Sequence, residues 1–253
     1  MNDIKKEDRQ RYRFLIEFDG TDFAGWQRQI DSTRTVQSEI ENALAQILQQ
    51  KVTLIGSGRT DAGVHALGQV AHADLFLANI SPQKLLSSMN SLLKADIHII
   101  SLNETSSDFH ARFQAISRSY RYRIERNRHP LLRRYIWTPQ YIWNDEFVIP
   151  AVELLIGRHS FKSFCLQRPG EEGYYCTIKS AKWEIDNDGV NFLITADRFL
   201  HKMVRGLVGA LIDVGRGRYS LDEFNQLLDN PKRNGAVSVA PPHGLTLMRV
   251  DYP

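Results

Sequence analysis

The chain has 253 residues, of which 42% are hydrophobic and 24% are charged, and only two are cysteines. At about 100 to 200 residues per domain, this length predicts one large domain or two modest domains, each able to bury a core. The composition excludes a disordered chain, a collagen-like repeat and a disulfide scaffold.

The longest uncharged apolar run, 206–212, is far shorter than a membrane span. The charged N-terminus lacks the apolar core of a signal peptide. Nothing else suggests export, so we expect reduced thiols at Cys165 and Cys176. These features predict a soluble cytoplasmic protein with no membrane partner.

Positive charge is concentrated in two stretches, although the formal net charge is only +3. Residues 112–134 contain eight arginines and one acid, Glu125. A second stretch carries Arg198, Lys202, Arg205, Arg216 and Arg218 against Asp213. Localised basic strips on a nearly neutral chain are typical of a protein that binds a phosphate backbone along a defined track.

The first hundred residues predict elements in the order β-α-β-β-α-β. The β-branched and aromatic segment 11–19 predicts a strand, and the following loop carries an exposed-looking Trp26. Apolar residues at helical spacing from Val36 to Leu48 predict a helix that Thr35 caps. The remaining elements are strands at 52–55, 69–75 and 97–102, a glycine-rich loop at 56–63, and a helix from Ser81-Pro82 to about Leu93.

The second half repeats a similar order of elements. The pattern predicts strands at 117–125, 179–185, 190–196 and 245–252, helices at 151–156, 199–214 and 221–228, an irregular stretch at 126–150 and a loop at 166–174. The similarity of the halves predicts an α+β fold. We expect two ferredoxin-like (RRM-like) α/β sandwich domains, 1–108 and 109–253, that share a mostly antiparallel sheet with a central cleft.

The most distinctive motif is Gly56–His65, GSGRTDAGVH. It is neither a Rossmann fingerprint nor a Walker loop, because the sixth position is Asp61 and Gly-Lys-Ser/Thr is absent. Asp61 lies two residues from Arg59, and a nearby guanidinium keeps a carboxylate ionised, as a nucleophile requires. The alternative is a carboxylate that caps a turn. The chemistry of these residues alone favours that structural role.

A second motif is RSYRYR at 118–123. Strand alternation places Arg118 and Tyr120 on one face and Arg121 on the other. An aromatic ring flanked by arginines is typical of RNA binders that stack an unpaired base and hold its phosphates. A half-buried strand with core tyrosines and solvated arginines explains the same pattern equally well.

A third motif begins at Phe199 and contains His201, Lys202 and Arg205 beside an apolar helical stripe. An arginine next to so apolar a stripe should have a carboxylate partner, and Asp61 is one candidate. The alternative is a surface arginine whose stem lies on the core.

No set of histidines or cysteines has the spacing of a metal site. His65 and His72 are seven residues apart, and the cysteines do not form a Cys-x-x-Cys pair. Nucleotide and redox-cofactor motifs are also missing from the sequence. We therefore expect neither a metal nor a cofactor.

Taken together, these segments resemble the tRNA pseudouridine synthases of the TruA family over essentially the whole chain. The similar segments are the opening at 18–27, the catalytic loop at 56–66, the entry to the second half at 109–113, the base-stacking strand at 118–122, the arginine helix at 203–205 and the ending at 244–253. These motifs are long enough to be specific.

The resemblance implies a cofactor-free homodimer that isomerises uridine to pseudouridine at positions 38, 39 and 40 of the tRNA anticodon stem-loop. It implies that Asp61 is the nucleophile and that Tyr120 stacks on the uracil. Arg205 would pair with the aspartate, Arg59 would lie against the RNA, and Leu245 would pack beneath the uracil.

Two positions depart from the family pattern. Ser160 stands where many relatives have aspartate, and 176–179 lacks an expected arginine. Neither position touches the catalytic loop, so the departures concern local loop structure and RNA docking.

Two other functions stay open at this point. A non-catalytic RNA-binding protein or tRNA chaperone would use the same basic strips with Asp61 dispensable. A nucleotide-dependent metabolic enzyme would use the glycine-rich loop, although the missing lysine and sixth glycine argue against it.

Overall fold

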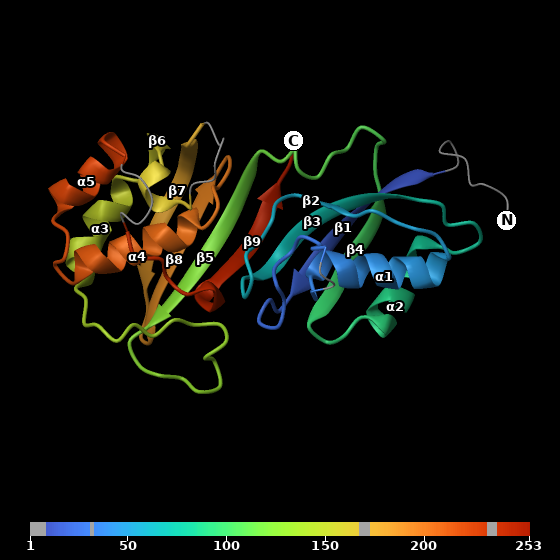
Figure 1. Ribbon diagram of the computed structural model, residues 1–253, viewed down its shortest axis with the longest axis horizontal. Coiled ribbons are helices and arrows are strands. Elements are labelled where there is room, and N and C mark those ends of the chain that lie inside the picture. Colours follow the sequence, from blue (N-terminus) through green and yellow to red (C-terminus); the bar gives the residue numbers. More distant parts are fainter. Residues whose placement is uncertain (1–8, 31–32, 167–172, 232–236) are drawn as a thin grey trace. The chain divides into compact units, whose positions relative to one another are not determined.

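The computed structural model describes residues 9–30, 33–166, 173–231 and 237–253. The first eight residues and most of the predicted loop at 166–174 lie outside these ranges. The chain forms two compact units, Met1–Ile116 with Leu247–Pro253, and Ser117–Thr246 (Figure 1). We call them unit 1 and unit 2. Both combine helices with mostly antiparallel strands, which confirms the predicted α+β class.

Unit 1 is built on strands in the order β4-β1-β3-β9, with β2 paired to β3. Their bounds are β1 Gln10–Phe18, β2 Ile55–Gly56, β3 His65–Leu75, β4 Ile97–Glu104 and β9 Leu245–Asp251, and the helices are α1 Val36–Leu48 and α2 Pro82–Leu92. Strand β1 runs antiparallel to β3 and β4 and buries alternate side chains from Tyr12 to Phe18. Helix α1 begins where predicted, because Thr35 and Ser38 form a reciprocal capping box.

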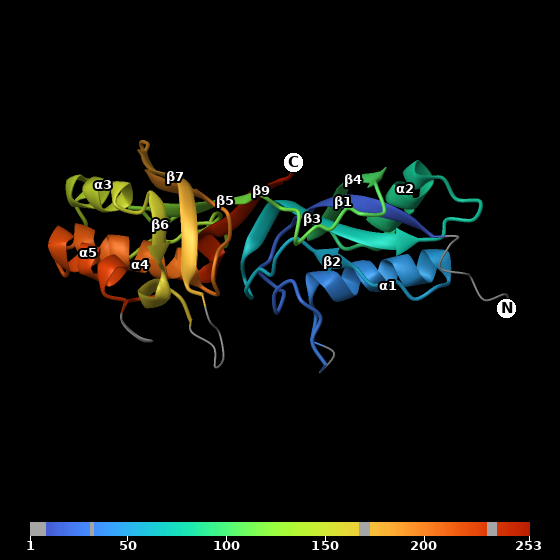
Figure 2. The ribbon, with the colours of Figure 1, turned by 90° about the horizontal axis from the view of Figure 1, so that it is seen from above.

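Unit 2 is built on strands in the order β5-β8-β7-β6, which pair antiparallel. Their bounds are β5 Ser117–Glu125, β6 Gly157–Ser160, β7 Tyr175–Ile185 and β8 Gly189–Ala196, and the helices are α3 Asp145–Glu153, α4 Met203–Gly215 and α5 Leu221–Asp229. Short 3-10 turns lie at Lys162–Phe164 and Pro242–Gly244. Helices α3, α4 and α5 pack against one another, as Figure 2 shows from above.

Two helices begin at different residues from those predicted. Helix α3 begins at Asp145 rather than at residue 151, because the Asn144 side chain accepts a hydrogen bond from the Glu146 N–H and caps the helix there. Pro150 lies inside this helix. Helix α4 begins at Met203 rather than at residue 199, because Lys202 has a left-handed backbone with φ 61°.

The division between the units falls after Ile116, whereas the sequence places a domain boundary at residue 108. The intervening segment is hydrogen-bonded to unit 1. The Ala111 N–H donates to His72 Nδ1 (3.1 Å), the Ile116 N–H to the Asp251 carbonyl (2.9 Å) and the Tyr252 hydroxyl to the Ala111 carbonyl (2.7 Å). Because β9 continues into unit 1 from Leu247, both ends of the chain belong to that unit.

His72 makes the stability of unit 1 depend on pH. Burial, with the nearby positive charge of Arg11 and His110, lowers the His72 pKa from 6.5 to about 4. The unfolded chain therefore binds more protons than the folded chain between these two pKa values. The contribution of neutral His72 is complete above pH 6.5 and is lost as the pH falls toward 4.

We expect the free energy of unfolding to be about 1 kcal/mol lower at pH 5.5 than at pH 7.5 through this group alone. His72→Gln retains a hydrogen-bond acceptor but does not titrate, so its melting temperature should depend less on pH over this interval. Thermal melts of both proteins at the two pH values test the assignment. Equal pH dependence in the two proteins would contradict it.

Within the described residues, no helix has the length and apolar character needed to cross a bilayer. Cys165 and Cys176 are both buried and form no disulfide, in agreement with the expected thiols. Burial raises the pKa of the Cys176 thiol to about 12, so this thiol is protonated at neutral pH.

Candidate active site

The Asp61 loop connects β2 to β3 in unit 1. Asp61 is half-buried, and its carbonyl accepts a hydrogen bond from the Val64 N–H (3.2 Å), which closes a tight turn. Gly63 in this turn has φ 76°, a conformation that favours glycine. The loop therefore leaves Asp61 half-buried in unit 1 instead of fully buried.

Trp26, in the segment between β1 and α1, holds the Asp61 loop in place. Its backbone N–H donates to the Thr60 carbonyl (3.1 Å), and its indole leaves no room for a side chain at Gly56, where a Cβ would lie 2.5 Å from the indole Nε1. Trp26 is only 1% exposed, so the expectation of an exposed tryptophan is wrong. The ring packs near Phe18, with 6.1 Å between centroids, and this contact joins the loop to β1.

The buried side chain of Gln69 holds the first residues of the loop, Ser57 and Gly58, in place. The Ser57 hydroxyl donates to Gln69 Oε1 (2.6 Å), and Gln69 Nε2 donates to the Gly58 carbonyl (3.1 Å). The Ser57 N–H also donates to the Val70 carbonyl (2.7 Å). Gln69 is completely buried. The Gln69 amide thus forms hydrogen bonds with both a side chain and a backbone carbonyl of the segment that leads to Asp61.

Arg59 is exposed, and a chain of polar side chains that runs through Gln27 to helix α1 orients it. Arg59 Nε donates to Gln27 Oε1 (3.1 Å), and Gln27 Nε2 donates to Gln37 Oε1 (2.7 Å). Gln37 Nε2 in turn donates to Glu41 Oε1 (2.9 Å) and to the Leu54 carbonyl (3.0 Å). Gln37 and Glu41 are buried, so this chain ends in a rigid anchor.

Tyr120 lies on β5 of unit 2 and is half-buried. Its ring meets the Phe199 ring edge-on, with 5.1 Å between centroids and 89° between planes. On the same face, Tyr122 is fully buried, and its hydroxyl donates to the Pro241 carbonyl (2.8 Å). Of the two tyrosines, Tyr122 therefore belongs to the core and Tyr120 is the accessible one.

Arg118, also on β5, is held by a backbone group, because its Nη1 donates to the Asp197 carbonyl (2.8 Å).

Arg205 lies in the first turn of α4 and is half-buried. Its Nε donates to the Ala240 carbonyl (2.8 Å), and its carbonyl accepts from the Ala240 N–H (3.0 Å). The next residue, Gly206, lies against the Phe164 carbonyl so closely that a Cβ would come within 2.1 Å of the oxygen. These contacts fix the position of Arg205 along the helix.

Three further predicted site residues belong to unit 2, namely Lys202, His201 and Leu245. Lys202 is the left-handed residue at the start of α4, and the His201 carbonyl accepts from the Leu166 N–H (2.9 Å). Both side chains are half-buried. Leu245, the first residue of β9, is only 6% exposed.

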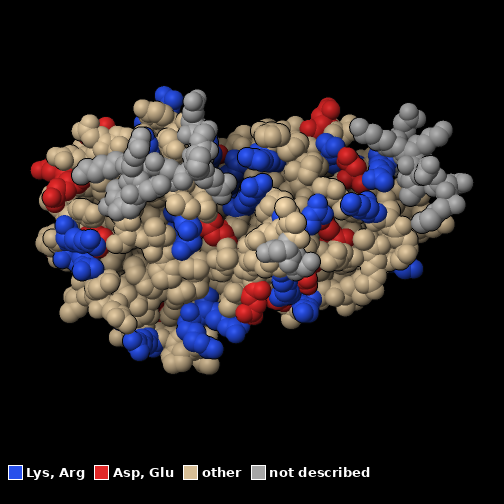
Figure 3. Space-filling model, viewed as in Figure 1, with Lys and Arg blue, Asp and Glu red and all other residues tan. Residues whose placement is uncertain are grey.

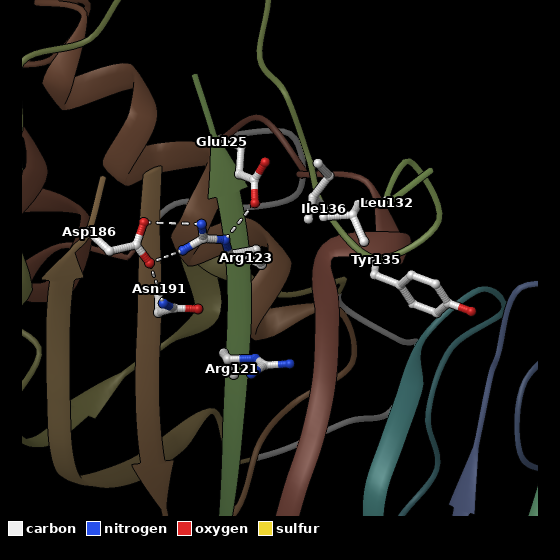
Figure 4. Close-up of a pocket in the computed structure, with 8 residues that line it drawn as sticks. All are labelled: Arg121, Arg123, Glu125, Leu132, Tyr135, Ile136, Asp186 and Asn191. Carbon is white, nitrogen blue, oxygen red and sulfur yellow. Dashed lines mark hydrogen bonds and ion pairs between the residues drawn. The ribbon is translucent and has the colours of Figure 1, made fainter. Parts of the chain in front are cut away.

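Arg121 lies on the opposite face of β5 from Tyr120. It lines an open pocket of about 320 Å³ together with Arg123, Glu125, Leu132, Tyr135, Ile136, Asp186 and Asn191 (Figure 4). Arg123 binds Glu125 and Asp186, and this guanidinium lowers the pKa of Asp186 to about 2. Arg121 lies apart from that cluster, and its Nε has no hydrogen-bond partner within the described residues. The side chains of Arg121 and Tyr120 therefore lie on opposite faces of β5.

Acidic side chains, some of them from other parts of the chain, neutralise part of the two basic stretches. Asp186 binds Arg123, Asp145 binds Arg126, and Asp213 lies within 3.5 Å of both Arg216 and Arg218. Figure 3 shows Lys and Arg side chains gathered over the loop that follows β5. The exposed arginines of this loop are Arg126, Arg128, Arg133 and Arg134. This loop is the part of the first stretch that presents most cations to solvent.

Among the described residues, no group of three or more His, Cys, Asp or Glu side chains could hold a metal ion. The two units thus supply distinct parts. Unit 1 carries a rigidly held carboxylate and a positioned arginine, and unit 2 carries an accessible aromatic ring and a helix-borne arginine.

Comparison with known proteins identifies the class of enzyme. The family model described as tRNA pseudouridine synthase matches residues 15–114 and 151–253. The tRNA pseudouridine synthase A of Ehrlichia chaffeensis is 38% identical over 96% of this chain and 100% of its own length. The proteins of the same name from an Exiguobacterium species and from Streptomyces avermitilis are 38% and 40% identical over 96% of this chain, and the matches cover 98% and 88% of their lengths.

These matches place the chain among the isomerases that act on tRNA. The chain belongs to the tRNA pseudouridine synthase family, which confirms the resemblance of its motifs.

Proposed function

We propose that this protein isomerises uridine to pseudouridine at positions 38, 39 and 40 of the tRNA anticodon stem-loop, with Asp61 as the nucleophile and without a cofactor. The observation that carries the assignment to Asp61 is the loop itself, in which Trp26 and Gln69 hold the segment from Ser57 to Thr60 while Asp61 stays half-buried. Since tRNA is the substrate, we place the reaction in the cytoplasm.

The reaction breaks the N1–C1′ bond of uridine and forms a C5–C1′ bond to the same ribose. One proton leaves C5 and one is gained at N1, so the step needs no oxidant and no water. Asp61 either attacks C1′ to give an ester or removes the C2′ proton to give a glycal, and both paths need an ionised carboxylate. The target nucleoside must leave the stem first, at a cost of a few kcal/mol.

The other residues bind and orient. In this proposal Arg205 pairs with Asp61 and keeps it ionised, while Arg59 lies against the RNA. Tyr120 stacks on the uracil, a contact worth about 1–3 kcal/mol, and its hydroxyl helps to remove the proton from C5, directly or by relaying it to water. Leu245 packs beneath the uracil. Four further residues contact the tRNA around this site or along its backbone, namely Arg118, Arg121, Lys202 and His201.

We also propose that the enzyme is a homodimer with a contact in the stretch 126–150. Large apolar side chains are exposed there, including Leu131 (91%), Ile142 (94%) and Phe147 (56%). These exposed apolar side chains are the surface that we assign to the dimer contact. Sedimentation of the purified protein tests this part separately from the chemistry.

The experiment that tests the reaction uses tRNA tritiated at uracil C5. The purified protein alone, with no added cofactor or methyl donor, should release tritium to water as pseudouridine forms. An RNA-binding protein or chaperone would bind the tRNA without releasing tritium. Release that depends on ATP or NAD would contradict the cofactor-free mechanism.

Gln27 provides a separate test of how Arg59 is positioned. Gln27→Ala removes the hydrogen bond to Arg59 Nε, so kcat/KM for tRNA should fall about 2- to 13-fold, since an exposed hydrogen bond of this kind contributes about 0.5–1.5 kcal/mol. Gln29→Ala is the matched control, because Gln29 lies in the same loop but donates to the Ala24 carbonyl.

In an Arg59→Ala background the Gln27 change should have no further effect, because the two residues act as a unit. Equal losses from Gln27→Ala and Gln29→Ala would show that the loop as a whole, and not this hydrogen bond, matters.

A further inference from the structure

A hydrogen-bonded turn after β4 presents an aromatic ring to solvent in unit 1. The N–H groups of Arg112 and Phe113 both donate to His110 Nδ1 (3.2 Å each). The Gln114 N–H donates to the His110 carbonyl (3.1 Å), and Gln114 Oε1 accepts from the His110 N–H (3.2 Å). Ala111 at the base of the turn is fully buried. Hydrogen bonds within the turn and the burial of Ala111 fix the backbone that carries Phe113.

Ring contacts continue from the core to this exposed side chain. The rings of Tyr252 and Phe109 are 5.1 Å apart, those of Phe109 and His72 are 6.0 Å apart, and those of His72 and His110 are 4.8 Å apart. Phe113 ends the series with its ring 4.3 Å from that of His110 and tilted by 31°. Phe109 and His72 are buried, whereas Phe113 is 77% exposed. Phe113 is therefore the solvent end of a packed aromatic series.

Cations flank the series at both ends. The Arg112 guanidinium lies 5.6 Å from the Phe113 ring centre, and that of Arg13 lies 4.6 Å from the Tyr252 ring centre. The same guanidinium lies 5.5 Å from the Phe109 ring centre, and within the described part of the chain Arg13 forms no ion pair with a carboxylate. A large apolar ring left in water forgoes the stabilisation of burial, and a fixed conformation lowers the entropic cost of binding.

We propose that Phe113 is a second base-stacking site, at which an unpaired nucleobase of the tRNA stacks on the ring while Arg112 contacts the adjoining phosphate. The inference rests on the proposed function, because it takes tRNA as the ligand. In the proposed function the target uridine stacks on Tyr120, so the nucleotide that stacks on Phe113 is a different one.

A nucleobase fits this surface better than a protein partner does. One rigid ring flanked by arginine matches base–aromatic stacking, which needs a single π face and a nearby cation. A stable protein interface buries about 800 Å² on each partner and is depleted in charge at its centre. The large apolar residues of the 109–116 segment that are exposed are only Phe113 and Ile116.

The test compares Phe113→Leu with Phe113→Trp. Leucine keeps an apolar side chain without a π face, so the Kd for tRNA should rise about 5- to 150-fold, and the effect should fall on Kd more than on the rate at saturating tRNA. Tryptophan retains stacking and should keep Kd within about threefold of wild type. Ile100→Ala, at another exposed apolar position of unit 1, is the matched control and should leave Kd unchanged. Equal melting temperatures show that the variants are folded.

A photoreactive benzoylphenylalanine at position 113 identifies the occupant directly, and it should crosslink to tRNA. An unchanged Kd in Phe113→Leu, or equal losses in the Leu and Trp variants, would overturn the proposal. A crosslink to a second copy of the chain, with a change in sedimentation of Phe113→Leu, would identify a protein contact instead. Tritium release by the wild-type protein separates these outcomes from a failure of the proposed function.

Discussion

Replacing Asp61 with asparagine should abolish pseudouridine formation while leaving tRNA binding intact. The amide is nearly isosteric with the carboxylate, but it can neither attack C1′ nor remove the C2′ proton. Loss of a catalytic nucleophile lowers kcat by about 10⁴-fold or more in well-studied enzymes, and we expect a loss of that order here. The loop should keep its shape, because its anchors at Trp26 and Gln69 do not involve the Asp61 side chain.

Tritium release and a tRNA gel-shift, measured side by side, check this result. Glu104→Gln removes an exposed carboxylate elsewhere in unit 1 and should have no effect on either measurement. Normal turnover by Asp61→Asn would end the nucleophile assignment. Loss of binding together with turnover would mean that the carboxylate has a structural role in the loop.

The second large effect is expected at Tyr120. If the phenol removes the proton from C5, Tyr120→Phe should lower the rate at saturating tRNA by about 10²- to 10⁴-fold, the range for general base catalysis. Phenylalanine retains the stacking face, so Kd should change little. Tyr120→Leu should add a rise in Kd of about 5- to 150-fold through lost stacking.

Single-turnover measurement of product and a titration of Kd separate the two roles of Tyr120. Tyr175→Phe removes the hydroxyl of an exposed tyrosine elsewhere in unit 2 and serves as the control. Unchanged turnover in Tyr120→Phe would rule out the hydroxyl as the base and leave stacking as its only role.

The elements that were predicted well are those whose signals are local. Thr35 with its capping box and Ser81 followed by Pro82 mark helix starts within a few residues of sequence, and both helices begin there. The start of α4 was not predictable in this way. Its first turn depends on the left-handed backbone of Lys202, which the apolar periodicity from Phe199 onward does not reveal.

The candidate site shows the same limit. The residues proposed to touch substrate lie in long motifs, so Asp61, Arg59 and Tyr120 could be selected from sequence. The residues that hold them could not, because their partners are distant in the chain. Trp26 meets a loop more than thirty residues away, and Gln69 reaches back to Ser57. No motif in the sequence pointed to Gln27 and Gln37 as supports of Arg59. Their spacing from Glu41 on α1 is a pattern that could identify such supporting residues in other sequences.

The charge pattern of the sequence located the basic stretches but did not show which of their arginines pair with carboxylates in the fold. Counting along the chain assigns Arg123 and Arg126 to a single basic strip. In the folded chain, Asp186 and Asp145 bind them from segments outside the strip. Pairing across the fold therefore decides which arginines remain for a phosphate backbone.

Mapping of pseudouridine in tRNA from cells that lack this protein tests the central claim most directly. The account predicts that positions 38, 39 and 40 carry unmodified uridine in such cells, and that wild-type protein restores the modification while Asp61→Asn does not. Unchanged pseudouridine at these positions in its absence, or restoration by Asp61→Asn, would contradict the account.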